Sequence, residues 1–229
     1  MKAYGSLELT VSSPPQVFTE PLTLAQARTY LRIEESSPAD PAQDELLSDY
    51  IAAAREVAEI LQGRDLIPKQ YDLALDLLLG HDAIAGAAYP LRWNSIYNFG
   101  VGYEIDLRAP LQSVDLFQHT DNTGAMVTLT EATDYVVDLK RSLVTPPWGQ
   151  VWPFFTPAVT SSVLIRFTSG YPATHPFWGN AGKRVIQGIR YLVAQWWENR
   201  IPFEPGRVSA EFPNTVTDLL TYGARPRVH

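Results

Sequence analysis

Residues 179–184 resemble a nucleotide-binding motif, because they read Gly-Asn-Ala-Gly-Lys-Arg ahead of a predicted helix. A phosphate-binding P-loop has four residues between its glycines, a Ser or Thr after the lysine and a strand before it. Here two residues separate the glycines, and Arg184 follows the lysine. We therefore interpret the stretch as a helix start rather than a nucleotide site.

Residue types that bind metals or transfer protons are present but lack a recognisable spacing. The histidines are His81, His119, His175 and His229. No two of them have the i, i+4 spacing that holds zinc on a helix. Asp72 and Asp76 share one face of a predicted strand, where paired carboxylates can act as acid and base, but such alternation is also typical of a solvated strand face. The chain has no cysteine and no Gly-x-Ser-x-Gly motif, so we expect no enzyme activity, no catalytic residues, no cofactor and no metal.

Aromatic residues gather in two sets of predicted loops. These are Trp93, Tyr97, Phe99 and Tyr103 in a Gly-rich region, and Trp148, Trp152, Phe154, Phe155, Phe177 and Trp178 in proline-rich connectors. Loop aromatics can stack on sugars or bases, and they are favoured anchors for protein partners. A net charge of −7 argues against a general nucleic-acid binder, which normally has a basic footprint. Protein partners are therefore favoured over nucleic acid.

The composition indicates a globular chain with an uneven charge. With 229 residues, 45% of them hydrophobic, it is long enough for one large domain or two small ones. No stretch reaches the roughly 20 apolar residues of a membrane-spanning helix, and no secretion signal is visible. Residues 20–66 hold ten acidic and four basic side chains, whereas residues 181–229 hold four acidic and seven basic ones. A basic end on an acidic body is typical of an interaction arm, although chance scatter over the surface would look the same.

Helical periodicity predicts two short and two long helices. A Thr-x-x-Gln capping box begins a short helix over residues 24–33, and Asp40 with Pro41 begins a long helix that ends at Gly63. A third helix with a matching apolar stripe is predicted over residues 181–200, and a short last helix is predicted over residues 215–222. Because the two long stripes need partners, we predict that they pack together. The predicted helical core is Leu47, Ile51, Ala54, Val57, Leu61, Ile189, Val193 and Trp196.

From Lys69 the apolar period changes from 3.6 to 2, which predicts strands. They are predicted at 69–76, 103–108, 112–119, 126–130, 135–138, 142–145 and 162–168. Residues 80–102 are interpreted as a long hairpin loop or an arm. Short strands without alternating helices indicate an antiparallel sheet or small barrel.

The predicted fold class is therefore α+β, a helical scaffold with an antiparallel β-rich insertion between the second and third helices. Its predicted parts are an extended segment over 1–19, a helical part over 20–68, the β-rich insertion over 69–170, the long third helix over 171–201, and a C-terminal arm with a short helix over 202–229.

Several segments, taken in order, resemble head–tail connector (adaptor) proteins of tailed bacteriophages, which also occur in prophages and gene transfer agents. They are 22–27 (Leu-Thr-Leu-Ala-Gln-Ala), 31–33, 51–59 (Ile-Ala-Ala-Ala-Arg-Glu-Val-Ala-Glu), 63–67, 110–114, 134–138, 166–171 (Arg-Phe-Thr-Ser-Gly-Tyr) and 193–200 (Val-Ala-Gln-Trp-Trp-Glu-Asn-Arg). The order and spacing of these segments carry the resemblance, since none of them is catalytic.

The resemblance implies a structural virion protein. Such proteins form a ring, typically of twelve copies, under the portal protein. The ring extends the DNA channel without sequence-specific DNA binding, and it docks a tail-side stopper or tail completion protein. The resemblance further implies a virion location, assembly in the host cytoplasm and no membrane. Residues 77–103 and 1–19 depart from the pattern expected for the family.

The family's C-terminal arm contacts the portal, so we predict a docking arm after the third helix. Its residues are Arg207, Val216, Leu219, Leu220, Tyr222, Arg225 and Arg227. So short a helix is not stable alone in water, because helix nucleation is costly. Its apolar residues therefore need a surface, either the chain's own helical part or the portal. The alternative functions are a phage-associated carbohydrate- or receptor-binding module and a hydrolase with an unrecognised site.

Overall fold

The computed structural model describes residues 5–9, 19–33, 41–75, 104–121, 123–150, 152, 162–198 and 214–221. The chain divides into two compact units: residues 1–16 with 68–170, called the β unit here, and residues 17–67 with 171–229, called the helical unit. Helices and antiparallel strands occur in separate units, so the predicted α+β class is confirmed.

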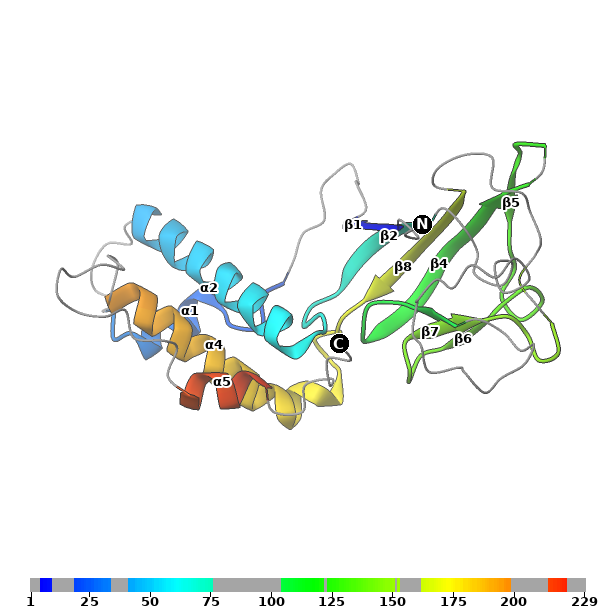
Figure 1. Ribbon diagram of the computed structural model, residues 1–229. Coiled ribbons are helices and arrows are strands. Elements are labelled where there is room, and N and C mark those ends of the chain that lie inside the picture. Colours follow the sequence, from blue (N-terminus) through cyan, green and yellow to red (C-terminus); the bar gives the residue numbers. More distant parts are fainter. Residues whose placement is uncertain are drawn as a thin grey trace. The chain divides into compact units, whose positions relative to one another are not determined.

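The β unit holds two antiparallel sheets (Figure 1). The larger has the order β1 (Gly5–Leu9), β2 (Lys69–Leu75), β8 (Val163–Ser169), β4 (Leu111–Thr120) and β5 (Met126–Thr128). The smaller has the order β3 (Ile105–Asp106), β7 (Leu143–Thr145) and β6 (Val136–Asp138). The described strands lie close to the predicted ranges, and β1 adds a strand to the segment predicted only as extended.

Strand β8 lies at the centre of the larger sheet, and the burial of its side chains alternates strictly. Val163, Ile165 and Phe167 are fully buried, and the residues between them are half-buried. This is the pattern of a strand with one face on a core. The buried core of the unit consists of Tyr71, Ile105, Leu107, Leu111, Phe117, Leu129, Tyr135, Val144, Trp152, Val163, Ile165 and Phe167.

The carboxylate of Asp72 has a structural partner on the neighbouring strand. Asp72 on β2 lies opposite Arg166 on β8. The Arg166 Nε donates to one carboxylate oxygen at 2.7 Å, and its Nη2 donates to the other at 3.0 Å. Such a two-point contact fixes strand register as well as charge. Asp76, the other half of the predicted acidic pair, lies outside the described residues, as do residues 80–102.

The helical unit is built from α1 (Leu24–Tyr30), α2 (Pro41–Gln62), η1 (Pro176–Gly179), α4 (Ala181–Glu198) and α5 (Asn214–Thr221). Helix α4 contacts each of the other helices, and α2 also contacts α1 and α5. The buried apolar core is Leu22, Ala27, Leu47, Ile51, Ala54, Ala58, Leu66, Val185, Ile189, Leu192, Val193, Val216 and Leu220.

The first helix is shorter than predicted because its last turn is capped early. The capping box predicted at its start is present. Leu31 is the C-cap, and Arg32 has φ of 56°, a left-handed conformation that a helix cannot continue. Helix α1 therefore ends at Tyr30 rather than at residue 33.

The predicted core residues fall into a buried and a half-buried set. Those in the buried set are Leu47, Ile51, Ala54, Ile189 and Val193, and those in the half-buried set are Val57, Leu61 and Trp196. Trp196 contacts the Tyr50 ring edge-on, at 6.1 Å between centroids. The contact between the two long helices therefore depends chiefly on small and branched side chains, with the tryptophan at its margin.

Replacing Ile189 should destabilise the helical unit more than replacing Trp196. Ile189 is fully buried, so Ile189→Ala removes apolar contacts and leaves a cavity at a cost of about 2–5 kcal/mol. Trp196→Ala should cost less, because part of that side chain already contacts water. Urea unfolding, monitored by the circular dichroism of the helices, measures the free energy of unfolding of both variants. A larger loss for Trp196→Ala would contradict this assignment of the core.

Candidate functional site

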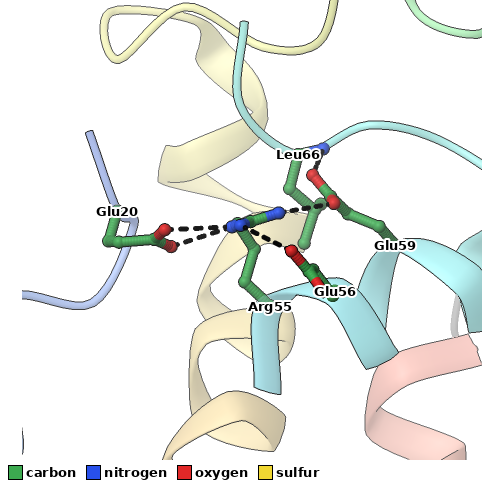
Figure 2. Close-up of polar contacts among 5 residues, drawn as sticks. All are labelled: Glu20, Arg55, Glu56, Glu59 and Leu66. Carbon is green, nitrogen blue, oxygen red and sulfur yellow. Dashed lines mark hydrogen bonds and ion pairs between the residues drawn. The ribbon is translucent and has the colours of Figure 1, made fainter. Parts of the chain in front are cut away.

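A buried arginine on α2 holds together two segments far apart in sequence (Figure 2). The Arg55 side chain is 3% exposed. Its Nε donates to both carboxylate oxygens of Glu20, at 3.1 and 2.9 Å, and its Nη1 donates to Glu59 at 2.7 Å. The second oxygen of Glu59 accepts the backbone N–H of Leu66 at 2.9 Å. The cluster thus attaches to α2 both the segment that precedes α1 and the turn that follows α2.

Helical geometry brings Arg55 and Glu59 together, because residues four apart lie on the same face. Burial alone would lower the pKa of Arg55, but the charges of Glu59 and Glu20 outweigh it and raise the pKa above its ordinary value. The arginine is therefore a fixed cation inside the unit, and its carboxylate partners offset its desolvation. Sequence reasoning gave this residue no role, although an arginine beside the apolar stripe with a glutamate at i+4 was a visible signal.

Removing the buried partner of Arg55 should be costly, and removing its exposed partner should not. Glu59→Ala removes the acceptor of the buried Arg55 Nη1 and of the Leu66 N–H, which should lower the free energy of unfolding by about 3–5 kcal/mol. Glu56 also contacts Arg55, at 3.5 Å, but its side chain is 64% exposed. The matched control Glu56→Ala should therefore cost less than about 1 kcal/mol. Equal losses in urea unfolding would show that the cluster is not what fixes these segments.

The motif-like stretch at the start of α4, residues 179–184, has a packing role. A Cβ added to Gly182 would lie 2.8 Å from the Trp178 ring and 2.9 Å from the Phe177 carbonyl oxygen. Phe177 stacks on Tyr171, with ring centroids 4.1 Å apart and planes 4° apart. The His175 Nδ1 accepts the N–H of Phe177 at 3.1 Å, which caps η1. The glycine, the histidine and these loop aromatics together fix the start of α4.

The remaining candidates for chemistry are dispersed. His119 is buried on β4 in the β unit, and the ring of Trp152 lies in the core of that unit. Trp148 is 96% exposed. Within the described ranges, no three or more His, Asp or Glu residues are grouped so that they could hold a metal ion. None of the described helices has the length and apolar character needed to cross a bilayer.

The predicted docking helix is packed against the chain's own helical unit. Val216 and Leu220 of α5 are buried and Leu219 is half-buried. A Cβ added to Gly188 of α4 would lie 2.5 Å from Leu220 Cδ2, so the two helices touch closely at this glycine. The predicted arm residues Arg207, Tyr222, Arg225 and Arg227 lie outside the described residues.

Shortening Leu220 should weaken the helical unit. Leu220→Ala opens a cavity against α4 and should cost about 2–5 kcal/mol. Asp218 lies on the same short helix and is exposed, so Asp218→Ala is the control and should change stability by no more than about 0.5 kcal/mol. Thermal unfolding of both variants by circular dichroism checks this. Equal melting of Leu220→Ala and the unaltered chain would mean that α5 does not contribute to the core.

Comparisons with known proteins place the fold. No family model and no curated protein matches the chain. Among solved structures, it is similar to a chain in the neck of an empty GTA particle computed with C6 symmetry, at 22% identity and a TM-score of 0.64, covering 98% of this chain and 97% of that one. A chain in the neck of a native GTA particle computed with C12 symmetry matches at 22% identity and a TM-score of 0.60, covering 98% and 97%. A chain in the virion of a native gene transfer agent (GTA) particle matches at 19% identity and a TM-score of 0.60, covering 96% and 94%.

These likenesses cover both units of the chain and nearly the whole length of each neighbour. They agree with the resemblance to connector proteins of phage-like particles that the sequence indicated. Since the identities lie between 19% and 22%, what they establish is the architecture. The protein has the fold of chains found in the neck and virion of gene transfer agent particles.

Proposed function

We propose that this protein is a structural component of a phage-like virion, a head–tail connector (adaptor) that forms a ring under the portal. The observation that carries the proposal is the fold match with neck chains of GTA particles over 98% of this chain and 97% of those chains. A small helical unit or a small β unit alone occurs in many unrelated proteins. A match that covers both units of one chain is therefore more specific than a match to either. The symmetries used for those necks, C6 and C12, support a ring of twelve copies.

In this proposal the ring extends the DNA channel between the portal and the tail. A channel lining needs no sequence-specific contacts, and the net charge of −7 fits a protein that lets DNA pass rather than one that grips it. The portal lies on one side of the ring, and a stopper or tail completion protein docks on the other. The protein acts without catalysis, cofactor, metal or membrane, and it joins particles assembled in the host cytoplasm.

The C-terminal arm, residues 202–229, is proposed to contact the portal. In the free chain Val216 and Leu220 are buried against the helical unit, so α5 acts as an anchor for the arm. The residues that follow Thr221, including Tyr222, Arg225 and Arg227, and Arg207 before α5, then supply the portal contacts. Deleting residues 202–229 would also remove Leu220 from the core, so a truncation after Thr221 isolates the contact more cleanly.

The carbohydrate- or receptor-binding alternative has one observation in its favour, the 96% exposure of Trp148. Exposed tryptophans stack on sugars, and they also anchor protein partners. In the connector proposal Trp148 belongs to a contact with a neighbouring virion protein. Glycan-array binding that disappears in Trp148→Ala would favour the alternative.

The test of the proposal is particle assembly with and without this chain. Without it, we expect DNA-filled, portal-bearing heads that lack tails, and adding purified chain should restore tail attachment in negative-stain images. The chain truncated after Thr221 should keep its helix content by circular dichroism but lose binding to portal-bearing heads. Glu131→Lys, an exposed change on the β unit, is the matched control and should bind such heads normally. Tailed, infectious or gene-transferring particles formed without the chain would contradict the proposal.

A further inference from the structure

One outward face of α2 is acidic. Glu45, Asp49 and Glu56 are all exposed. At 3.6 residues per turn they lie within roughly 40° of one another around the helix axis. The buried residues of the helix, such as Ile51 and Ala54, lie on its opposite side. We call Glu45, Asp49 and Glu56 the acidic face.

A groove of about 330 Å³ lies between α1 and α4 of the same unit. It is lined by Ala25, Gln26, Thr29, Tyr30 and Arg190. Within the described residues, the Nε of Arg190 is itself buried and has no hydrogen-bond acceptor. The groove therefore combines small and aromatic surface with the half-buried cationic side chain of Arg190.

The positive charge beside this groove continues along α4 at Lys183, which is exposed. We call Lys183 and Arg190 the basic face. They are seven residues apart, as are Asp49 and Glu56 on α2. Seven residues of helix span about 10.5 Å. Two charges of one sign on α4 thus match, in spacing, two of the opposite sign on α2.

The two faces of one copy cannot meet each other. Helices α2 and α4 run beside each other (Figure 1) and pack through their apolar sides, so their charged sides point away from the shared core. A two-fold contact of either face with itself would oppose like charges. A contact of the acidic face of one copy with the basic face of the next pairs opposite charges, and such a head-to-tail contact closes into a ring when its rotation allows.

We propose that neighbouring copies of this chain bind each other through these surfaces, with the acidic face of α2 seated against the α1–α4 groove and basic face of the next copy. The proposal rests on the ring of the proposed function and names its contact. Apolar area at its margins comes from Ile60, which is 61% exposed at the end of the acidic side of α2, and from Tyr30 in the groove, which is 37% exposed. Charge then sets the direction in which copies join.

Charge-reversed variants of the full chain test the contact. One variant carries Asp49→Lys with Glu56→Lys, and the other carries Lys183→Glu with Arg190→Glu. Each alone places like charges across the contact, so self-association measured by sedimentation velocity should weaken at least about tenfold. An equimolar mixture of the two variants should associate again. When the two variants alternate, opposite charges meet across the contacts between them. At about 1 M salt, where the Debye length is about 3 Å, association of the unaltered chain should also weaken.

The controls are Glu131→Lys and Lys140→Glu, two substitutions at exposed residues of the β unit. They reverse one charge of each sign and should leave self-association unchanged. Circular dichroism checks folding of every variant. Should Glu56→Lys disturb the Arg55 cluster, Glu45→Lys with Asp49→Lys replaces it as the basic variant. Carbodiimide coupling followed by mass spectrometry should link Lys183 of one copy to a carboxylate of the acidic face of another.

Three results would overturn the contact: an unaltered chain that stays monomeric at every concentration in low salt, a reversed variant that associates normally, or a mixture that associates no better than its parts. Failure of the neck proposal looks different. In that case the charge-swap pattern would hold in solution, but the assembled chain would bind no portal-bearing heads.

Discussion

The buried guanidinium of Arg55 is the constraint on which the course of the chain through the helical unit depends. A cation with a side chain only 3% exposed must be surrounded by acceptors, since an unpaired buried charge costs several kcal/mol. Glu20 and Glu59 meet that need from two segments, and Glu59 also takes the N–H of Leu66. The segment before α1 and the turn after α2 are therefore fixed to the same point of one helix, immediately before the chain passes into the β unit at residue 68.

With those segments fixed, small residues decide how closely the helices pack. Gly188 lets Leu220 of α5 lie directly against α4, and Gly182 lets Trp178 and Phe177 cover the first turn of α4. The short C-terminal helix gains a stable place in this way, although eight residues are too few to hold a helix in water. The helical unit thus completes its apolar core with its own chain and leaves charged side chains on its surface.

A helical unit with a complete apolar core and charged surface side chains suits a subunit of a larger particle. A head-to-tail contact built on charge allows copies to remain separate until they are concentrated at one place, and it joins them in a single direction. The fold shared with neck chains of GTA particles gives this arrangement its proposed setting. A ring of such units would be held by surface contacts, while each subunit keeps its own core.

Periodicity alone determined the α+β class, the long helices and most strands, because a 3.6- or 2-residue apolar repeat is a local property of the sequence. The capping box at Thr23 was equally local. The early end of α1 depended on the left-handed conformation of Arg32. The placement of Leu220 depended on Gly188, which is 32 positions earlier in the sequence. Arg55 and Glu20 are 35 positions apart in the sequence, and Arg166 and Asp72 are 94 positions apart. Only the tertiary structure could decide such pairings, since a buried or bridging charge is recognised by its partners in space and not by its neighbours in sequence.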